Sequence, residues 1–331
     1  MTSTHRVVER EAWSRYWNKG LLHACASSFS SSYGGAIATF WQDQLIRYCN
    51  ADQQIIDFGC GNGPIAMLLC EGLQDLPRYL GIDYAELAPQ WLNRLHEQQR
   101  TQIRFLSPQD FRNLPIEDNA ADWLVSQFGA EYGGLQAALS EALRVLKPGG
   151  RLLWMVHHHD SIIVRQAAEE SGHIDFLCQP GGLIDLASKL LDPFSRATSA
   201  QAVRRLNANK RNIELRENYN VCLDLLADRC ASSHVPAILL DSRDWVSAIV
   251  QGSRTEGAKA AQQRLGELSG LLSDSKERLR QLRIAAQNEA SMQHLFEPAN
   301  ASLAIDAMQR EILYQGDEII AWCLALSKPM H

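Results

Sequence analysis

The segment 55–63, with the sequence IIDFGCGNG, constrains the fold of this chain more than any other. A short apolar stretch ends in Asp57, three glycines follow at alternate positions, and Pro64 then opens a helical segment. Glycines permit the sharp turn between a buried strand and a helix, and they let a ligand lie against the backbone. We therefore predict a strand over 54–58, a ligand-binding turn over 59–63 and a helix over 64–70.

Strand and helix signals continue to alternate as far as residue 158. Strands are predicted over 78–83, 103–106, 121–127 and 151–157, with helices over 87–99 and 135–146. Strands separated by helices form a parallel sheet through right-handed crossovers. Alternating apolar residues over 303–307, a turn over 314–318 and a strand over 319–326 predict an antiparallel hairpin. The predicted fold class is therefore α/β, with a doubly wound, mostly parallel sheet and an antiparallel C-terminal hairpin.

Residues 160–300 carry mainly helical signals and are too long for a connection. One helical face collects the leucines of the last part of this region, opposite charged and amide side chains: Leu265, Leu268, Leu272, Leu279 and Leu282. The segment 236–240 is predicted as a short strand. The chain thus divides into an N-terminal helical lid (1–50), a ligand-binding core (51–159 and 301–331) and an inserted helical substrate cap (160–300).

The lid region places Trp13, Tyr16 and Trp17 at helical spacing, before a loop of small residues. The simpler interpretation is that these rings form the apolar face of an amphipathic helix. The functional alternative is that their faces lie over a cationic ligand, which aromatic rings attract.

Charge and composition narrow the choice of partners and compartment. The net charge is −6 and no run of lysine or arginine exceeds two residues, which argues against nucleic acid as a partner. The first ten residues lack the apolar stretch of a signal peptide, and no segment reaches transmembrane length. We expect a cytoplasmic protein that does not enter the membrane. The oligomeric state stays open, and a homodimer is compatible with the sequence.

Acidic residues at the strand ends favour a cationic nucleoside ligand over a dinucleotide. Asp57 suits a ligand with an ammonium and a sulfonium group, whereas a pyrophosphate prefers bare helix N–H groups. The glycine spacing also differs from the GxGxxG of nicotinamide enzymes. Asp83, at the next strand end, can accept both ribose hydroxyls, or it is a solvated turn residue. Asp110 and Phe111 suit an adenine ring, or they are a helix N-cap and a core aromatic.

The order of these segments resembles the class I S-adenosylmethionine (SAM) dependent methyltransferase family. The matching segments are IDFGCGNG, YLGIDYAELA, LPIEDNAADWLVSQFG and EALRVLKPGGRLLW, and the terminal ILYQGDEIIAWCLALSKP is similar to the family's final hairpin. The resemblance implies a Rossmann-like, seven-stranded sheet, SAM as cofactor and S-adenosylhomocysteine as product. The cofactor-binding residues that it implies are Asp57, Gly59, Cys60, Gly61, Gly63, Asp83, Tyr84, Asp110, Phe111 and Gln127, with Ser126 and Phe128 at the mouth and Tyr16 in the lid.

The acceptor side depends on the ends of the fourth and fifth strands, since ligands bind at the carboxyl ends of parallel strands. His157 and His158 end the fifth strand, and alternation directs them to opposite faces. A histidine with an ordinary pKa of about 6.5 can take a proton from a hydroxyl acceptor. Glu131 could hold an amine or orient a histidine, and Tyr132 could hydrogen-bond the nucleophile. These four are the candidate catalytic residues, with surface or core positions as the alternative.

No metal is predicted, because the only candidate ligands in one place are His157, His159 and Asp160. The Asn/Asp-Pro-Pro-Tyr/Phe signature of adenine and glutamine N-methyltransferases is absent from the segment 126–132, SQFGAEY. In this family, insertions of the observed kind shape acceptor pockets. We therefore expect methyl transfer to a small molecule, in specialised metabolism.

Three other hypotheses stay open at this point. The first keeps SAM but replaces methyl transfer with an intramolecular cyclisation or an elimination at the sulfonium. The second is a nicotinamide-dependent oxidoreductase, against which the glycine spacing argues. The third is a non-catalytic partner subunit, against which the intact glycines and Asp83 argue.

Overall fold

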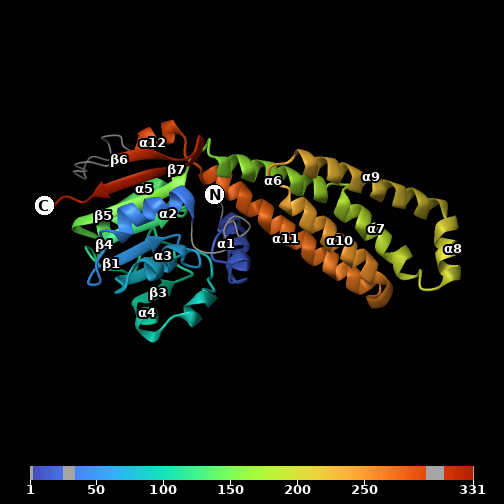
Figure 1. Ribbon diagram of the computed structural model, residues 1–331, viewed down its shortest axis with the longest axis horizontal. Helices are drawn as coiled ribbons and strands as arrows, with labels where there is room; N and C mark the ends of the chain where they lie inside the picture. Colours follow the sequence, from blue (N-terminus) through green and yellow to red (C-terminus); the bar gives the residue numbers. More distant parts are fainter. Residues whose placement is uncertain (1–2, 25–33, 296–308, 331) are drawn as a thin grey trace. The chain divides into compact units, whose positions relative to one another are not determined.

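The computed structural model describes residues 3–24, 34–295 and 309–330 (Figure 1). The chain forms two compact units: the first comprises 1–165 and 281–331, and the second 166–280. The first unit carries every strand of the sheet, and the described part of the second unit is helical. We refer to them below as the sheet unit and the helical unit.

The sheet unit is built on seven strands in the order β3-β2-β1-β4-β5-β7-β6. Strands β1 to β5 pair in parallel, and β7 runs antiparallel to both β5 and β6. The predicted α/β, Rossmann-like fold class is thereby confirmed. The strands are β1 (Gln54–Phe58), β2 (Arg78–Ile82), β3 (Ile103–Leu106), β4 (Ala121–Gln127), β5 (Leu146–His157), β6 (Gln309–Gln315) and β7 (Glu318–Ser327).

Helices cover both faces of this sheet. The helices of the sheet unit are α1 (Ser3–Trp17), α2 (Gly35–Trp41), the π-helix η1 (Gln42–Ile46), α3 (Pro64–Gly72), the 3-10 helix η2 (Gln90–Arg94), α4 (Glu97–Gln102), the 3-10 helix η3 (Ala130–Gly133), α5 (Leu135–Val145) and α12 (Glu289–Leu295). Successive strand side chains point to opposite faces, so each strand feeds two cores. Ile56 packs in the core shared with α5 and α12, whereas its neighbour Ile55 packs in the core shared with α2 and α3.

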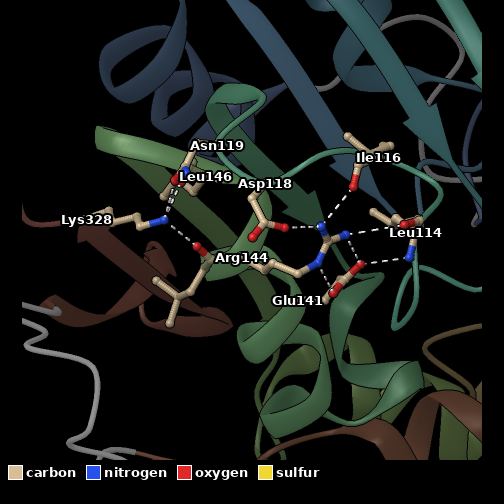
Figure 2. A network of polar contacts seen from close by, with 9 residues as sticks. Leu114, Ile116, Asp118, Asn119, Glu141, Arg144, Leu146 and Lys328 are labelled. Atoms are coloured by element: carbon tan, nitrogen blue, oxygen red, sulfur yellow. Dashed lines mark hydrogen bonds and ion pairs between the residues drawn. The ribbon is translucent and has the colours of Figure 1, made fainter.

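A polar network ties the loop after β3 to the end of α5 (Figure 2). Arg144 pairs with Glu141 through two hydrogen bonds of 2.8 and 2.6 Å, and it also contacts Asp118 at 2.7 Å. Glu141 in turn accepts the backbone N–H of Leu114 at 2.7 Å. Two-point arginine–carboxylate pairs fix geometry as well as adding energy. The network therefore holds the loop that follows the predicted adenine-side residues.

The helical unit contains long helices around a separate apolar core. The helices are α6 (Ile162–Cys178), α7 (Leu183–Ser195), α8 (Ala200–Ala208), α9 (Lys210–Ser232), α10 (Ala237–Glu256) and α11 (Ala258–Ala285), of which α6 and α11 extend past the limits of the unit. Leu265, Leu268 and Leu272 of the predicted leucine stripe are buried in this core. The helical character of the insertion is as predicted, while its role as a substrate cap stays a prediction.

Several local predictions differ from the structure. The predicted strand over 236–240 is wrong: Pro236 caps α10, whose first turn buries Leu239 among helices instead of in a sheet. The helix predicted over 87–99 is interrupted, since η2 ends at Arg94 and α4 begins at Glu97. Part of the segment assigned to the insertion belongs to the sheet unit, where α12 buries Met292 in the sheet core. The alternation predicted over 303–307 lies outside the described residues.

Candidate functional site

The glycine turn at the carboxyl end of β1 is a point of close backbone approach. Gly59, Gly61 and Gly63 have φ angles of 65°, 51° and 84°, a region that residues with a side chain rarely adopt. A Cβ on Gly59 would lie 2.5 Å from the Cα of Gly129, and one on Gly61 would lie 2.7 Å from the ring of Trp17. The turn therefore needs glycine both for its own conformation and for the segments packed on it.

Asp83, at the end of β2, holds this turn in place. One carboxylate oxygen accepts the backbone N–H of Gly61 at 2.8 Å, and the other accepts that of Ala85 at 2.8 Å. Burial raises the pKa of Asp83 to about 6. Each carboxylate oxygen can accept more than one hydrogen bond, so both retain capacity for a diol such as a ribose. The ribose assignment stays a prediction that this geometry allows.

Asp57 is the more unusual of the two carboxylates, because one of its oxygens has no hydrogen-bond partner among the described residues. The Tyr79 hydroxyl donates to Oδ2 at 2.5 Å, whereas Oδ1 is buried and makes no hydrogen bond among the described residues. Burial, partly offset by the Tyr79 hydrogen bond, raises the pKa of Asp57 to about 8. A buried carboxylate without a counter-ion is costly unless it is protonated or meets a cation. The residues present therefore fit a ligand with an ammonium and a sulfonium group.

Asn62 links the glycine turn to the N-terminal helix, and it was missed in the analysis of the sequence. Its fully buried side chain donates to the carbonyls of Trp17 at 2.9 Å and Leu21 at 2.7 Å, and it accepts the N–H of Ala88 at 2.9 Å. A polar residue between glycines was the only available signal. The end of α1 is thus fastened directly to the turn.

Through this link the aromatic rings of α1 join those of the β4 loop. Trp13 stacks on Trp17 at 5.8 Å between ring centroids and meets Tyr132 edge-on at 5.8 Å. Tyr16 donates its hydroxyl to the carbonyl of His23 at 2.6 Å. The described part of the predicted lid therefore lies against the glycine turn and beside Tyr132, and its contact with the cofactor stays a prediction.

On the acceptor side, Glu131 contacts the backbone of His157 and not its ring, so an orienting role for Glu131 stays a prediction. Glu131 accepts the backbone N–H of His157 at 2.9 Å through Oε1, while its Oε2 is buried without a hydrogen-bond partner among the described residues. Burial raises the pKa of Glu131 to about 8. The His157 ring stacks on Phe128 at 4.3 Å and meets Tyr132 at 6.2 Å.

Burial changes what His157 can do chemically. It lowers the pKa of His157 to about 3, so the imidazole is neutral and only weakly basic. The assumption that this histidine has an ordinary pKa is therefore wrong. Its Nδ1 is buried and has no hydrogen-bond partner in the described part of the chain, which leaves it a polar contact for a ligand.

His158 does not join this group. Its ring stacks on Trp322 at 4.5 Å, on the face of the sheet opposite to Phe128 and His157. The structure thus follows the strand alternation and removes His158 from the candidate catalytic residues. His159 is exposed and contacts Asp160 at 3.0 Å. Within the described residues, no group of three or more His, Cys, Asp or Glu side chains is placed to hold a metal ion.

The end of β4 adds one further polar contact and a strained backbone. Trp41 of α2 donates to Oε1 of Gln127, and Nε2 of Gln127 is buried without a partner among the described residues. Ser126 joins the two turns, since it donates to the carbonyl of Phe58 at 2.7 Å and accepts from Ala130 at 2.9 Å. Phe128 has a φ of 53°, and strain of this kind is concentrated at functional sites.

The remaining predicted cofactor residues take mixed positions. Phe111 is buried in the sheet core and stacks on Phe58 at 4.9 Å, which matches the core interpretation and removes one ring face from any adenine. Asp110 pairs with Arg112. Tyr84 is exposed, and Cys60 is buried with its thiol directed to the carbonyl of Gly61. The adenine-side roles of Asp110, Tyr84 and Phe111 stay predictions.

The carboxyl edge of the sheet thus combines a glycine turn, two buried carboxylates and a set of aromatic rings. Such an edge of an α/β sheet suits a nucleoside ligand that carries positive charge. Residues 55–150 match the family described as methyltransferase domain. Over this segment the chain is similar to class I SAM-dependent methyltransferases, whose cofactor is SAM.

Two curated relatives match about a third of this chain. The demethylmenaquinone methyltransferase of Thermus thermophilus is 34% identical over 104 residues, which are 31% of this chain and 46% of that protein. The ubiquinone/menaquinone biosynthesis C-methyltransferase of Rickettsia prowazekii is 28% identical over 120 residues, 34% of this chain and 48% of that protein. The chain therefore spans about half the length of these curated relatives.

Among solved structures, the S-adenosylmethionine-dependent methyltransferase of Mesorhizobium loti is 20% identical, with a TM-score of 0.32 over 39% of this chain and 56% of that one. That likeness is too distant to carry a functional argument. In the described part of the chain, no helix is both long and apolar enough to cross a membrane.

Proposed function

We propose that this protein transfers the methyl group of SAM to a nucleophile on a small molecule. The observation that carries the proposal is Asp57, whose buried Oδ1 lacks both a hydrogen bond and a neighbouring cation at the mouth of the glycine turn. Asp57 and the turn would hold the methionine part of SAM, and Asp83 the ribose. Bound there, SAM supplies an electrophilic methyl group on a sulfonium.

The chain's own residues supply positioning around that methyl group. Gln127, Glu131 and His157 each present a buried polar atom without a partner among the described residues. Gln127 and His157 end the adjacent strands β4 and β5, and Glu131 lies in η3, which follows β4. Holding a nucleophile in line with a reacting carbon accounts for a large part of the rate in such displacements. The names of two relatives support a small-molecule acceptor, since they refer to menaquinone and ubiquinone. Methylation in specialised metabolism and a cap role for the helical unit belong to the same proposal.

Calorimetric titration with SAM and S-adenosylhomocysteine tests the first step, and product analysis tests the second. We expect both ligands to bind the full chain, and Asp57→Asn to weaken SAM more than S-adenosylhomocysteine, because only SAM carries the sulfonium charge. We expect S-adenosylhomocysteine as the product of turnover. Absence of binding would refute the proposal. Formation of methylthioadenosine without a methylated acceptor would favour the cyclisation or elimination hypothesis instead.

A further inference from the structure

We infer that the acceptor is an amine, bound as its ammonium ion between Glu131 and the aromatic rings of Trp13, Phe128 and Tyr132. This inference rests on the proposed methyl transfer and names the substrate class of that site. It also makes Glu131, rather than a histidine, the residue that takes a proton from the nucleophile.

The Glu131 carboxylate lacks a counter-charge among the described residues. Glu131 is 4% exposed, and among the described residues it has neither an ion pair nor a lysine or arginine that influences its ionisation. Its Oε1 accepts the backbone N–H of His157. Oε2 is buried without a hydrogen bond. A buried carboxylate in this state is either protonated or completed by a cation from outside the protein.

Aromatic rings gather around Glu131 and His157. Tyr132 directly follows Glu131, and its ring meets Trp13 at 5.8 Å and the His157 ring at 6.2 Å. Phe128 stacks on the His157 ring, with 4.3 Å between the ring centroids. Aromatic faces attract ammonium groups, and a carboxylate beside such rings strengthens the attraction. His157 adds no repulsion, because burial lowers its pKa to about 3 and leaves it neutral.

The reaction of a bound ammonium ion also requires a proton acceptor. An ammonium has no lone pair, so it must lose a proton before its nitrogen can attack. Burial raises the pKa of Glu131 to about 8, which brings it closer to an alkylammonium pKa of about 10.4 than an ordinary glutamate is. Proton transfer to Glu131 is therefore less uphill than transfer to a solvated carboxylate.

The Glu131 carboxylate takes one proton from R–NH3+ and becomes a carboxylic acid, leaving R–NH2. The nitrogen lone pair forms the new N–C bond as the S–C bond breaks, and that electron pair stays on sulfur. The products are S-adenosylhomocysteine and R–NH2+–CH3, and the proton on Glu131 then leaves to solvent.

Comparing the binding of a charged probe with that of its neutral isostere distinguishes recognition of an ammonium ion from general apolar binding. The full chain loaded with S-adenosylhomocysteine is titrated with tert-butylammonium and with tert-butanol at about pH 9, where the Glu131 carboxyl is ionised. We expect the cation to bind at least ~10-fold more tightly than the alcohol. In Glu131→Gln, whose amide oxygen can still accept the His157 N–H, we expect this preference to disappear. Glu117→Gln, an exposed site in the same unit, is the matched control and should retain the preference.

Further variants and an activity assay distinguish the possible outcomes. Tyr132→Leu should weaken the cation several-fold and Tyr132→Phe should restore it, which a merely structural role of the hydroxyl would not produce. The inference is overturned if the cation binds no better than the alcohol, or if folded Glu131→Gln keeps the preference. It is also overturned if the enzyme methylates a neutral phenol or quinol but no amine, a result that leaves methyl transfer intact. If S-adenosylhomocysteine itself does not bind, the proposed function fails, and the amine inference fails with it.

Discussion

Replacing Asn62 with alanine should release the N-terminal helix from the glycine turn without unfolding the sheet unit. The Asn62 side chain makes three hydrogen bonds, two to carbonyls at the end of α1 and beyond it, and one to the N–H of Ala88. A buried hydrogen bond contributes about 1 kcal/mol net, so loss of the two bonds to Trp17 and Leu21 amounts to about 2 kcal/mol, which corresponds to ~30-fold more frequent opening. Other contacts of α1 persist, such as Ser14 with the N–H of Glu86 at 3.0 Å.

Hydrogen–deuterium exchange measured by mass spectrometry reports this opening directly. Peptides over residues 7–24 should exchange much faster in Asn62→Ala, while peptides over α5 should not change. Asn113→Ala, at an exposed position in the same unit, is the matched control. We also expect weaker SAM binding, since the turn loses the segment packed on it. Unchanged exchange over 7–24, or an equal increase over α5, would refute the reasoning.

The remaining predictions concern the cofactor, the loop network and the buried acids. Asp83→Ala should weaken SAM by about 1.5–3 kcal/mol in calorimetry, and unchanged affinity would contradict the ribose assignment. Arg144→Met should lower the free energy of unfolding in urea by about 1–2 kcal/mol, because its partner carboxylate loses a two-point contact that is partly exposed. Burial raises the pKa of Asp57 and Glu131 to about 8, so the folded state binds more protons than the unfolded chain between about pH 4 and 8. The melting temperature of the ligand-free protein should therefore fall as pH rises through this range, less steeply in Glu131→Gln; an identical slope would contradict it. His157→Phe, which keeps a ring against its neighbours, should lower turnover less than ~10-fold, and a loss of ~100-fold or more would restore the histidine as base.

The sequence by itself was sufficient for the features that depend on short stretches of chain. Glycines at 59, 61 and 63 after an apolar segment predict the turn because only glycine readily adopts its positive φ angles. Apolar runs of strand length predicted β1 to β5 because a central parallel strand is buried on both faces. The leucine stripe over 265–272 predicted its helix because one face repeats every turn.

Tertiary structure decided which partners these elements receive and how their side chains ionise. The adjacency of β1, β4 and β5 brings Glu131 to the backbone of His157. No local pattern indicated that Tyr79 would hold Asp57, since that contact depends on the register between β1 and β2. Ionisation depends on burial from all sides: His157 lies in a site where its pKa falls to about 3, although the residue type alone suggests about 6.5. Such surroundings are assembled from segments more than a hundred residues apart, as between Trp13 and Tyr132, and are therefore invisible to any window of sequence.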